Sequence, residues 1–76
     1  MTINDLQVGQ KGIIREVGGE GPLRLRFLDM GLIPGTQVQL QKIAPMGDPI
    51  QIQVRGYDLT IRREDAKMIA VQEVTK

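Results

Sequence analysis

The segment from Leu28 to Gly35 constrains the fold more than any other, because it ends a helix and starts a strand within eight residues. Gly31 stands where a left-handed residue ends a helix, since only glycine takes a positive φ without a steric penalty from Cβ. Leu32 is expected to fold back onto the last helical turn. Pro34-Gly35 suits the centre of a type II turn, whose second central residue needs a positive φ. The sequence that follows is therefore predicted to be a strand.

Alternation of apolar and polar residues predicts a sheet. Residues 37–41 and 50–54 alternate strictly between apolar residues and glutamine, which is typical of antiparallel strands that cover a core with one face. In an earlier strand, the adjacent pair Ile13-Ile14 predicts a bulge or burial on both faces. Because outward glutamines resist edge pairing less well than lysines, a weak homo-oligomer formed through a strand edge is a further expectation. The predicted strands span residues 12–17, 37–41, 50–54, 57–61 and 68–74.

One helix is predicted, over residues 22–30. Proline is favoured at the first helical position, and Pro22 stands there after a glycine-rich link. Leu25, Leu28 and Leu32 follow at i, i+3 and i+7, so we expect them to face the core. The same face is widened by Leu23, Phe27 and Met30.

These elements predict a mainly β fold. About five short strands with one short helix inserted after the first are typical of a small, strongly bent antiparallel barrel. The chain has 76 residues, a length at which one small core forms, so we expect a single domain over residues 1–76.

The residue inventory argues against an enzyme. The sequence contains no His, Cys or Ser, so the usual pairs of nucleophile and base cannot be assembled. Asp48 and Asp58 are the candidate acid–base pair, and the simpler interpretation is that each caps a turn. Without imidazole or thiolate ligands, no metal site and no cofactor is expected. The glycine-rich link carries Glu20 and is followed by no lysine, so it is interpreted as a plain linker and not as a phosphate-binding loop.

The charge balance makes nucleic acid a weak candidate partner. Ten basic and nine acidic residues leave a formal charge of +1, which gives no long-range attraction to nucleic acid or to an anionic membrane. Arg55, Arg62 and Arg63 form at most a modest patch near Tyr57, and one tyrosine is a poor stacking platform. No apolar run approaches a membrane span, and the first residues lack the features of a signal peptide. A soluble cytoplasmic protein is therefore predicted.

Binding to another protein is the function that these exclusions leave. Residues 44–49 form a predicted loop, centred on Gly47-Asp48, that carries Met46 as an apolar tip between two prolines. Loops on a rigid scaffold commonly hold interaction residues. Arg24 and Arg26 are expected to project from the outer face of the helix as rim or regulatory charges. The predicted contact surface consists of Arg24, Arg26, Leu32, Met46, Asp48, Arg55 and Tyr57.

The sequence resembles the ferrous-iron transport protein A (FeoA) family in four segments taken together, residues 6–10, 28–35, 44–50 and 59–66. The resemblance implies an SH3-like β-barrel. It also implies a cytosolic partner, recruited to the inner face of the membrane, that binds and regulates a membrane Fe²⁺ transporter with a GTPase domain. If such a partner activates the GTPase, Arg24 or Arg26 is the candidate arginine finger, although a solvated arginine is the simpler interpretation.

Two alternatives stay open. A similar barrel forms the C-terminal domain of iron-dependent repressors, but this chain lacks the DNA-binding helix-turn-helix and the metal-binding residues of that class. A small barrel that binds nucleic acid is the third interpretation, and a strongly salt-dependent gel shift would favour it.

Overall fold

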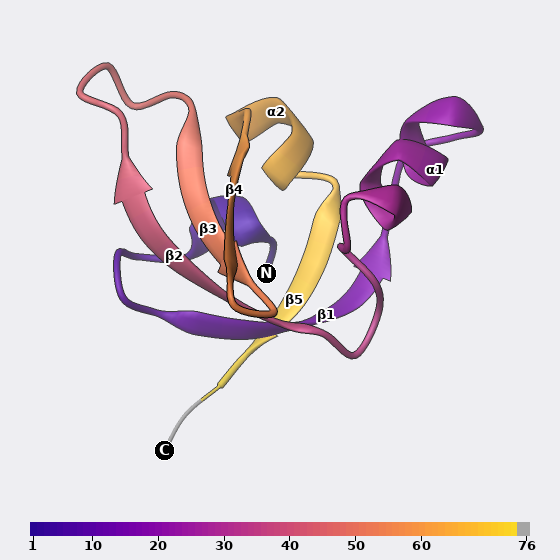
Figure 1. Cartoon of the computed structure of the whole chain (residues 1–76), viewed down its shortest axis with the longest axis horizontal. Coiled ribbons are helices and arrows are strands. Elements are labelled where there is room, and N and C mark those ends of the chain that lie inside the picture. The colour runs from indigo at the N-terminus through magenta and orange to yellow at the C-terminus, as the bar shows by residue number, and fades with distance from the viewer. Residues whose placement is uncertain (75–76) are drawn as a thin grey trace.

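The computed structural model describes residues 1–74, which form one five-stranded antiparallel sheet with two short α-helices and one 3₁₀ turn (Figure 1). In chain order the elements are η1 (Ile3–Asp5), β1 (Lys11–Val17), α1 (Pro22–Asp29), β2 (Gln37–Ile43), β3 (Ile50–Val54), β4 (Tyr57–Ile61), α2 (Arg63–Ala66) and β5 (Ile69–Glu73). The strands lie in the order β4-β3-β2-β1-β5. The prediction of a mainly β fold with one helix after the first strand is confirmed.

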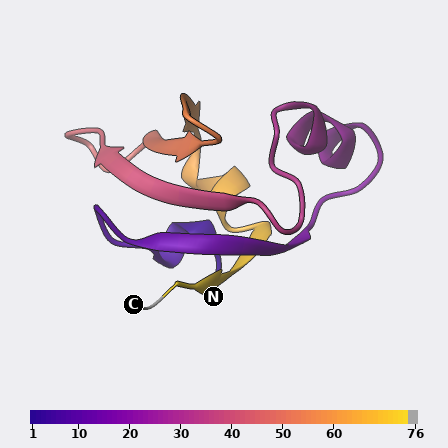
Figure 2. The same ribbon diagram turned by 60° about the horizontal axis from the view of Figure 1, so that its bottom comes forward.

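The sheet curves strongly but does not close into a barrel within residues 1–74 (Figure 2). Its two edges are β4 and β5, which are not paired with each other. The N-terminus occupies the outer edge of β5: the Val71 amide donates to the Met1 carbonyl at 2.9 Å, and Thr2 bridges Ala70. Because this edge already has a partner, the predicted barrel is corrected to an open, strongly curved sheet.

The strict alternation in β2 and β3 produces one buried and one outward face, as predicted. Val38 and Leu40 of β2 pack inward beside Ile52 and Val54 of β3, and all four are buried. The predicted irregularity in β1 is also present, since the register with β5 shifts between Ile14 and Glu16. The core is completed by Ile3, Leu6, Ile14, Val17, Phe27, Leu32, Ile50, Ile61, Ala66, Ile69 and Val71.

The segment that follows α1 adopts the predicted cap and turn. Gly31 has φ 95°, its amide donates to the Leu28 carbonyl at 3.0 Å, and the Leu32 amide donates to the Phe27 carbonyl at 3.1 Å. This pair of bonds is a Schellman motif, which satisfies two carbonyls at the helix end. Gly35 has φ 93°, and the Thr36 amide donates to the Ile33 carbonyl at 3.0 Å across the second turn.

The buried face of α1 differs from the prediction at one position. Phe27 is fully buried, whereas Leu25 is 60% exposed. Successive residues of a helix are rotated by about 100°, so positions 25 and 27 lie on nearly opposite sides and cannot both face the core. The larger aromatic side chain takes the inward position because its burial removes more apolar surface from water. The expectation that Leu25 faces the core is therefore wrong.

Candidate docking surface

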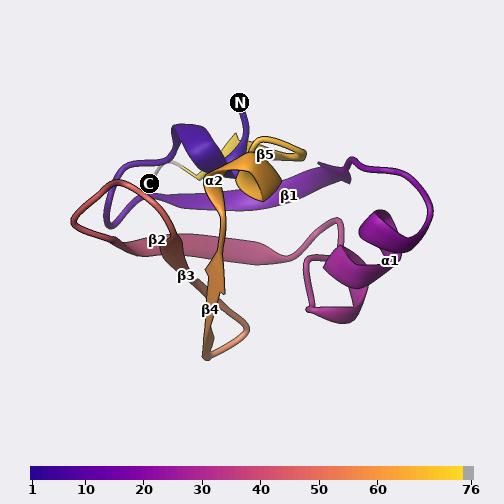
Figure 3. The same ribbon diagram turned by 90° about the horizontal axis from the view of Figure 1, so that it is seen from above.

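The seven residues predicted to contact a partner do not form one surface. Met46 lies in the β2–β3 loop, at the opposite end of the molecule from α1, which carries the two rim arginines (Figure 3). Arg55 and Tyr57 belong to the tight β3–β4 hairpin. Leu32 has no exposed surface, because the Schellman motif folds it into the core. Its proposed place on the contact surface is therefore corrected to a place in the core.

The β2–β3 loop presents Met46 to solvent. The Gly47 amide donates to the Ala44 carbonyl at 2.7 Å, so Pro45-Met46 is the centre of the turn, and not the predicted Gly47-Asp48. Proline at the first central position and glycine at the last position favour this turn. A second bond, from the Ala44 amide to the Pro49 carbonyl at 3.0 Å, closes the base of the loop. Met46 is 94% exposed at the tip of this hydrogen-bonded loop.

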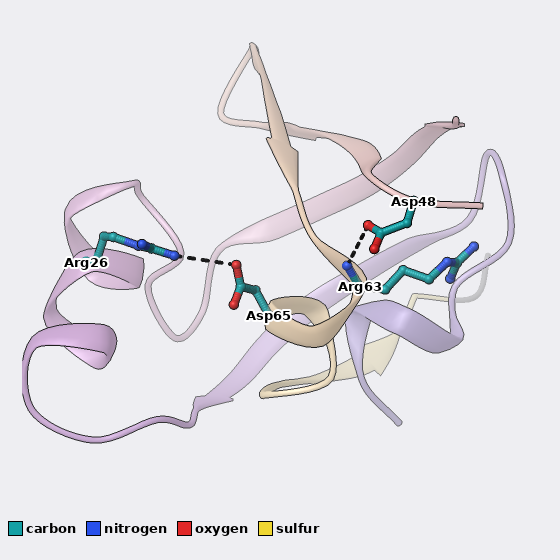
Figure 4. A network of polar contacts seen from close by, with 4 residues as sticks. All are labelled: Arg26, Asp48, Arg63 and Asp65. Carbon is teal, nitrogen blue, oxygen red and sulfur yellow. Dashed lines mark hydrogen bonds and ion pairs between the residues drawn. The ribbon is translucent and has the colours of Figure 1, made fainter. Parts of the chain in front are cut away.

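Asp48 acts as a cap for α2. Its Oδ1 accepts a hydrogen bond at 3.1 Å from the Arg63 amide, which is the first amide of the helix (Figure 4). A carboxylate at this position satisfies an otherwise unpaired donor and interacts favourably with the helix dipole. Asp58 lies opposite Gln53, at the other end of β3. The two carboxylates are therefore not brought together, and Asp48 contacts the start of α2 instead of capping a turn of its own loop.

Arg63 joins three segments that are far apart in the sequence. Its Nη1 donates to Oδ1 of Asn4 in η1 at 2.9 Å, and its Nε donates to the Gly47 carbonyl in the β2–β3 loop. Together with the Asp48 cap, these contacts fix the loop that carries Met46 against η1 and α2. Sequence reasoning missed this role, because the partners of Arg63 become neighbours only when the sheet has formed.

Both arginines of α1 are engaged within the protein. Nε of Arg24 donates to the Val17 carbonyl at 3.2 Å. Nη2 of Arg26 lies 3.5 Å from Oδ2 of Asp65 in α2 (Figure 4). The Arg26 side chain is 61% exposed, so this ion pair is screened by water and contributes little to stability. The pair nevertheless shows that the Arg26 side chain of α1 reaches α2.

The β3–β4 hairpin has a two-residue turn. Val54 pairs with Tyr57, and the intervening Arg55 and Gly56 have φ values of 51° and 86°. Two central residues with positive φ are characteristic of a type I′ turn, whose twist matches that of the strands. Arg55 is the one non-glycine residue with positive φ among residues 1–74. Its Nη2 donates to Oγ1 of Thr36 at 3.3 Å, although Thr36 is only 7% exposed.

A groove of about 530 Å³ opens beside this turn. Two of its lining residues are cationic, Lys11 and Arg55, and none is acidic. The other lining residues are Pro34, Gly35, Thr36, Gln37, Val38, Gln39, Gln53 and Gly56. Only Arg55 of these was predicted as a contact residue. The groove was missed because strand register, which places Lys11 opposite Gln39 and Gln39 opposite Gln53, cannot be read from any one segment.

Within the described residues, no group of three or more His, Cys, Asp or Glu side chains gathers closely enough to hold a metal ion. None of the helices in residues 1–74 has the length and apolar character needed to cross a membrane.

Comparison with known proteins identifies the family. A family model described as the FeoA domain matches residues 1–73. A curated relative from Porphyromonas gingivalis (strain ATCC BAA-308 / W83), described as an Fe(2+) transport protein A/Fe(2+) transporter FeoB fusion protein, is 33% identical over 75 residues. That match covers 99% of this chain but only 9% of the relative.

Solved structures agree with the fold. The solution NMR structure of FeoA from Chlorobium tepidum is 33% identical with a TM-score of 0.91, and the match covers 99% of this chain and 71% of that one. The crystal structure of Stenotrophomonas maltophilia FeoA, described as a prokaryotic SH3 domain protein, has a TM-score of 0.83 at 22% identity, over 95% of this chain and 89% of that one. This second likeness concerns the fold alone, and it confirms the SH3-like class.

The fold also occurs within a larger protein. The crystal structure of T. acidophilum IdeR matches with a TM-score of 0.84 at 21% identity, over 97% of this chain and 34% of that one. At this level of identity the likeness concerns only the fold, so it does not favour a repressor function for this chain.

Proposed function

Because the chain belongs to the FeoA domain family, we propose that it is a non-enzymatic accessory protein of ferrous iron uptake, which binds the membrane Fe²⁺ transporter and regulates it by protein–protein contact. In this proposal residues 1–76 act as one SH3-like domain at the cytoplasmic face of the membrane. The transport step belongs to the membrane partner.

The observation that carries the proposal is the P. gingivalis relative, in which a segment like this chain and a transporter named FeoB belong to one polypeptide. Covalent fusion keeps two domains at a high effective concentration, which favours pairs of domains that work together. The chain spans only 9% of that relative, so the transporter activity of the fusion protein is assigned here to the partner.

Met46 is the proposed centre of the contact. Among the seven predicted residues it is the most exposed apolar side chain, and the hydrogen bonds at the base of its loop hold it in place. Methionine adapts its shape to a partner's surface, and a rigid loop loses little conformational entropy on binding. Arg24 and Arg26 already have partners within this chain, so an arginine-finger role is not part of the proposal.

The test is calorimetric titration of the protein with the cytosolic portion of its host's ferrous iron transporter, with a GTP analogue, with GDP and without nucleotide. Met46→Glu is compared with Leu25→Glu, which places the same charge on an exposed apolar residue of α1, at the opposite end of the molecule. We expect Met46→Glu to weaken binding about tenfold or more, and Leu25→Glu to have little effect.

Two outcomes would contradict the proposal. Absence of binding in all three nucleotide states would show that the chain does not bind the cytosolic portion of the transporter. Equal weakening by the two variants would show that the added charge, and not the position of Met46, is responsible. A difference in affinity between the GTP-analogue and GDP states would support regulation of the GTPase cycle, because a ligand shifts an equilibrium only through its differential affinity for the two states.

A further inference from the structure

We propose that the groove beside the β3–β4 turn binds an extended acidic segment of the partner polypeptide, with Lys11 and Arg55 pairing with its carboxylates. This inference rests on the proposed function, because it assigns a chemistry to part of the partner. It concerns a different surface from the Met46 loop, so the two proposals are tested separately.

The charge of the groove is the first observation. Lys11 and Arg55 line it, and no lining residue is acidic. In the part of the chain that the structure describes, the only ion pair joins Arg26 to Asp65. Neither cation of the groove is therefore neutralised by a carboxylate of residues 1–74. In a protein whose total charge is only +1, this is a local concentration of positive charge that attracts acidic groups.

The conformation of Arg55 is the second observation. At the first central position of a type I′ turn, Asn, Asp and Gly are the preferred residues, because they tolerate a positive φ. Arg55 has φ 51°, and its side chain donates one hydrogen bond, to Oγ1 of Thr36 at 3.3 Å. Strained residues of this kind cluster at binding sites, where the side chain has a use that outweighs the cost in stability. Here the left-handed backbone directs the guanidinium to Thr36 at the groove.

The shape and polar lining of the groove are the third observation. Its volume of about 530 Å³ is in the range of ligand sites and far exceeds one inorganic ion. Gln37 and Gln53 also line it, and a side-chain amide can donate to and accept from the main chain of a bound segment.

The spacing of the two cations favours an extended ligand. Lys11 lies opposite Gln39, and Gln39 lies opposite Gln53, so Lys11 and Gln53 are two strands apart, or about 10 Å. Arg55 follows Gln53 by two residues. Alternate residues of an extended chain lie on the same side and about 7 Å apart. A segment with acidic residues at alternate positions therefore presents its carboxylates at a spacing that two long cationic side chains can reach.

Nucleic acid is the less favoured ligand. Binding of single strands uses aromatic side chains as stacking platforms in addition to positive charge. No aromatic residue lines the groove, and the nearby Tyr57 directs its hydroxyl to the Met30 carbonyl.

The test is an NMR titration of the full ¹⁵N-labelled chain with a short peptide of alternating Glu and Ser, an uncharged peptide of alternating Gln and Ser, and oligothymidylate. The variant is Arg55→Asn, which removes the charge and places the preferred residue in the turn, so the hairpin is retained. Arg62→Asn is the matched control: Arg62 lies outside the groove, at the N-cap of α2, where asparagine is also preferred.

We expect the Glu peptide to shift the amide signals of residues 37–39 and 53–56 and the Gln peptide to leave them in place. Arg55→Asn should lower the affinity for the Glu peptide about fivefold or more. The affinity of Arg62→Asn for the same peptide should stay within about twofold of that of the original chain. Lys11→Gln provides a second variant and should weaken binding by a similar factor. The melting temperature of Arg55→Asn should be retained, because the preferred turn residue offsets the lost hydrogen bond to Thr36. A retained melting temperature separates lost binding from lost folding.

Equal shifts with the Glu and Gln peptides, or unchanged affinity in Arg55→Asn, would overturn the inference. Tighter binding of oligothymidylate at the same residues would overturn it as well.

The transporter titration distinguishes a failure of the groove inference from a failure of the proposed function. If Arg55→Asn binds the transporter as well as the original chain does, the groove assignment fails and the partnership stands. If the original chain binds the Glu peptide at the groove but not the transporter, the partnership fails and the acidic-ligand site stands.

Discussion

The hydroxyl of Tyr57, at the start of β4, donates a hydrogen bond to the main-chain carbonyl of Met30, at the C-terminal end of α1. The two residues are 27 positions apart in the sequence. The bond satisfies a carbonyl that has no acceptor role inside the helix, and it attaches α1 to the β3–β4 hairpin. Tyr57 was predicted as a contact residue for a partner, and the structure shows that it has this internal role.

Tyr57→Phe removes the hydroxyl and keeps the ring, so it measures this bond. We expect the free energy of unfolding to fall by about 1 kcal/mol, as for a typical intramolecular hydrogen bond. Urea denaturation measures the change, and hydrogen exchange locates it: protection should fall in α1 more than in β2 and β3. Unchanged stability together with unchanged protection of α1 would contradict a role for the bond.

Gly31→Ala tests the close approach of the hairpin to the helix cap. A Cβ at Gly31 would collide with the Tyr57 hydroxyl, and the backbone there has φ 95°. Gly35 is the matched control, since it has φ 93° but no atom within 4 Å of the position that a Cβ would take. We expect Gly35→Ala to cost about 1 kcal/mol from backbone strain alone, and Gly31→Ala to cost about 2 kcal/mol or more. Equal losses, measured by urea denaturation, would show that the collision does not matter.

Phe27→Ala and Leu25→Ala test which side of α1 is buried. Phe27 has no exposed surface and Leu25 is 60% exposed. Truncation of a buried phenylalanine should cost about 3 to 5 kcal/mol, whereas the exposed leucine should change stability by no more than about 0.5 kcal/mol. Thermal denaturation separates these values. A larger loss from Leu25→Ala would mean that α1 turns its other side toward the core.

Asp48→Ala tests the cap of α2. Removal of the acceptor of the Arg63 amide should cost about 1 kcal/mol. Asp48→Asn keeps an oxygen at this position and should cost less, because asparagine caps a helix nearly as well as aspartate does. Asp58→Ala is the control on an exposed strand position and should have an effect within about 0.5 kcal/mol. If Asp48→Ala and Asp58→Ala lowered the free energy of unfolding equally in chemical denaturation, the capping contact would not contribute to stability.

Much of the local structure was predictable because it depends on one residue or on a short run of neighbours. Gly31 and Gly35 take the positive φ values that their positions require. Pro22 begins α1, and the alternation with glutamine in β2 and β3 sorts these strands into a buried and an outward face. In each case the physical cause is a steric limit on φ or the two-residue period of a strand, and both act within the segment itself.

The candidate surfaces were less predictable, because exposure depends on what packs against a residue. Met46 was correctly expected at a solvent-facing loop tip. Leu32 was expected in the same contact surface, although the cap predicted around it draws the side chain into the core. The arginines of α1 project from the helix as expected, but their partners, the Val17 carbonyl and Asp65, come from other elements.

By itself the sequence determined the cap at Gly31, the turn at Pro34-Gly35 and the succession of strands and helix, since these follow from residue identity and local spacing. The tertiary structure alone decided that Phe27 and not Leu25 is buried, because that choice depends on the competition between two apolar side chains for one core. It also decided that the sheet stays open and that Lys11 and Arg55 line one groove. The N-terminal segment occupies the edge of β5, and strand register places Lys11 near Gln53 and Arg55. Both are relations between segments that no single segment contains.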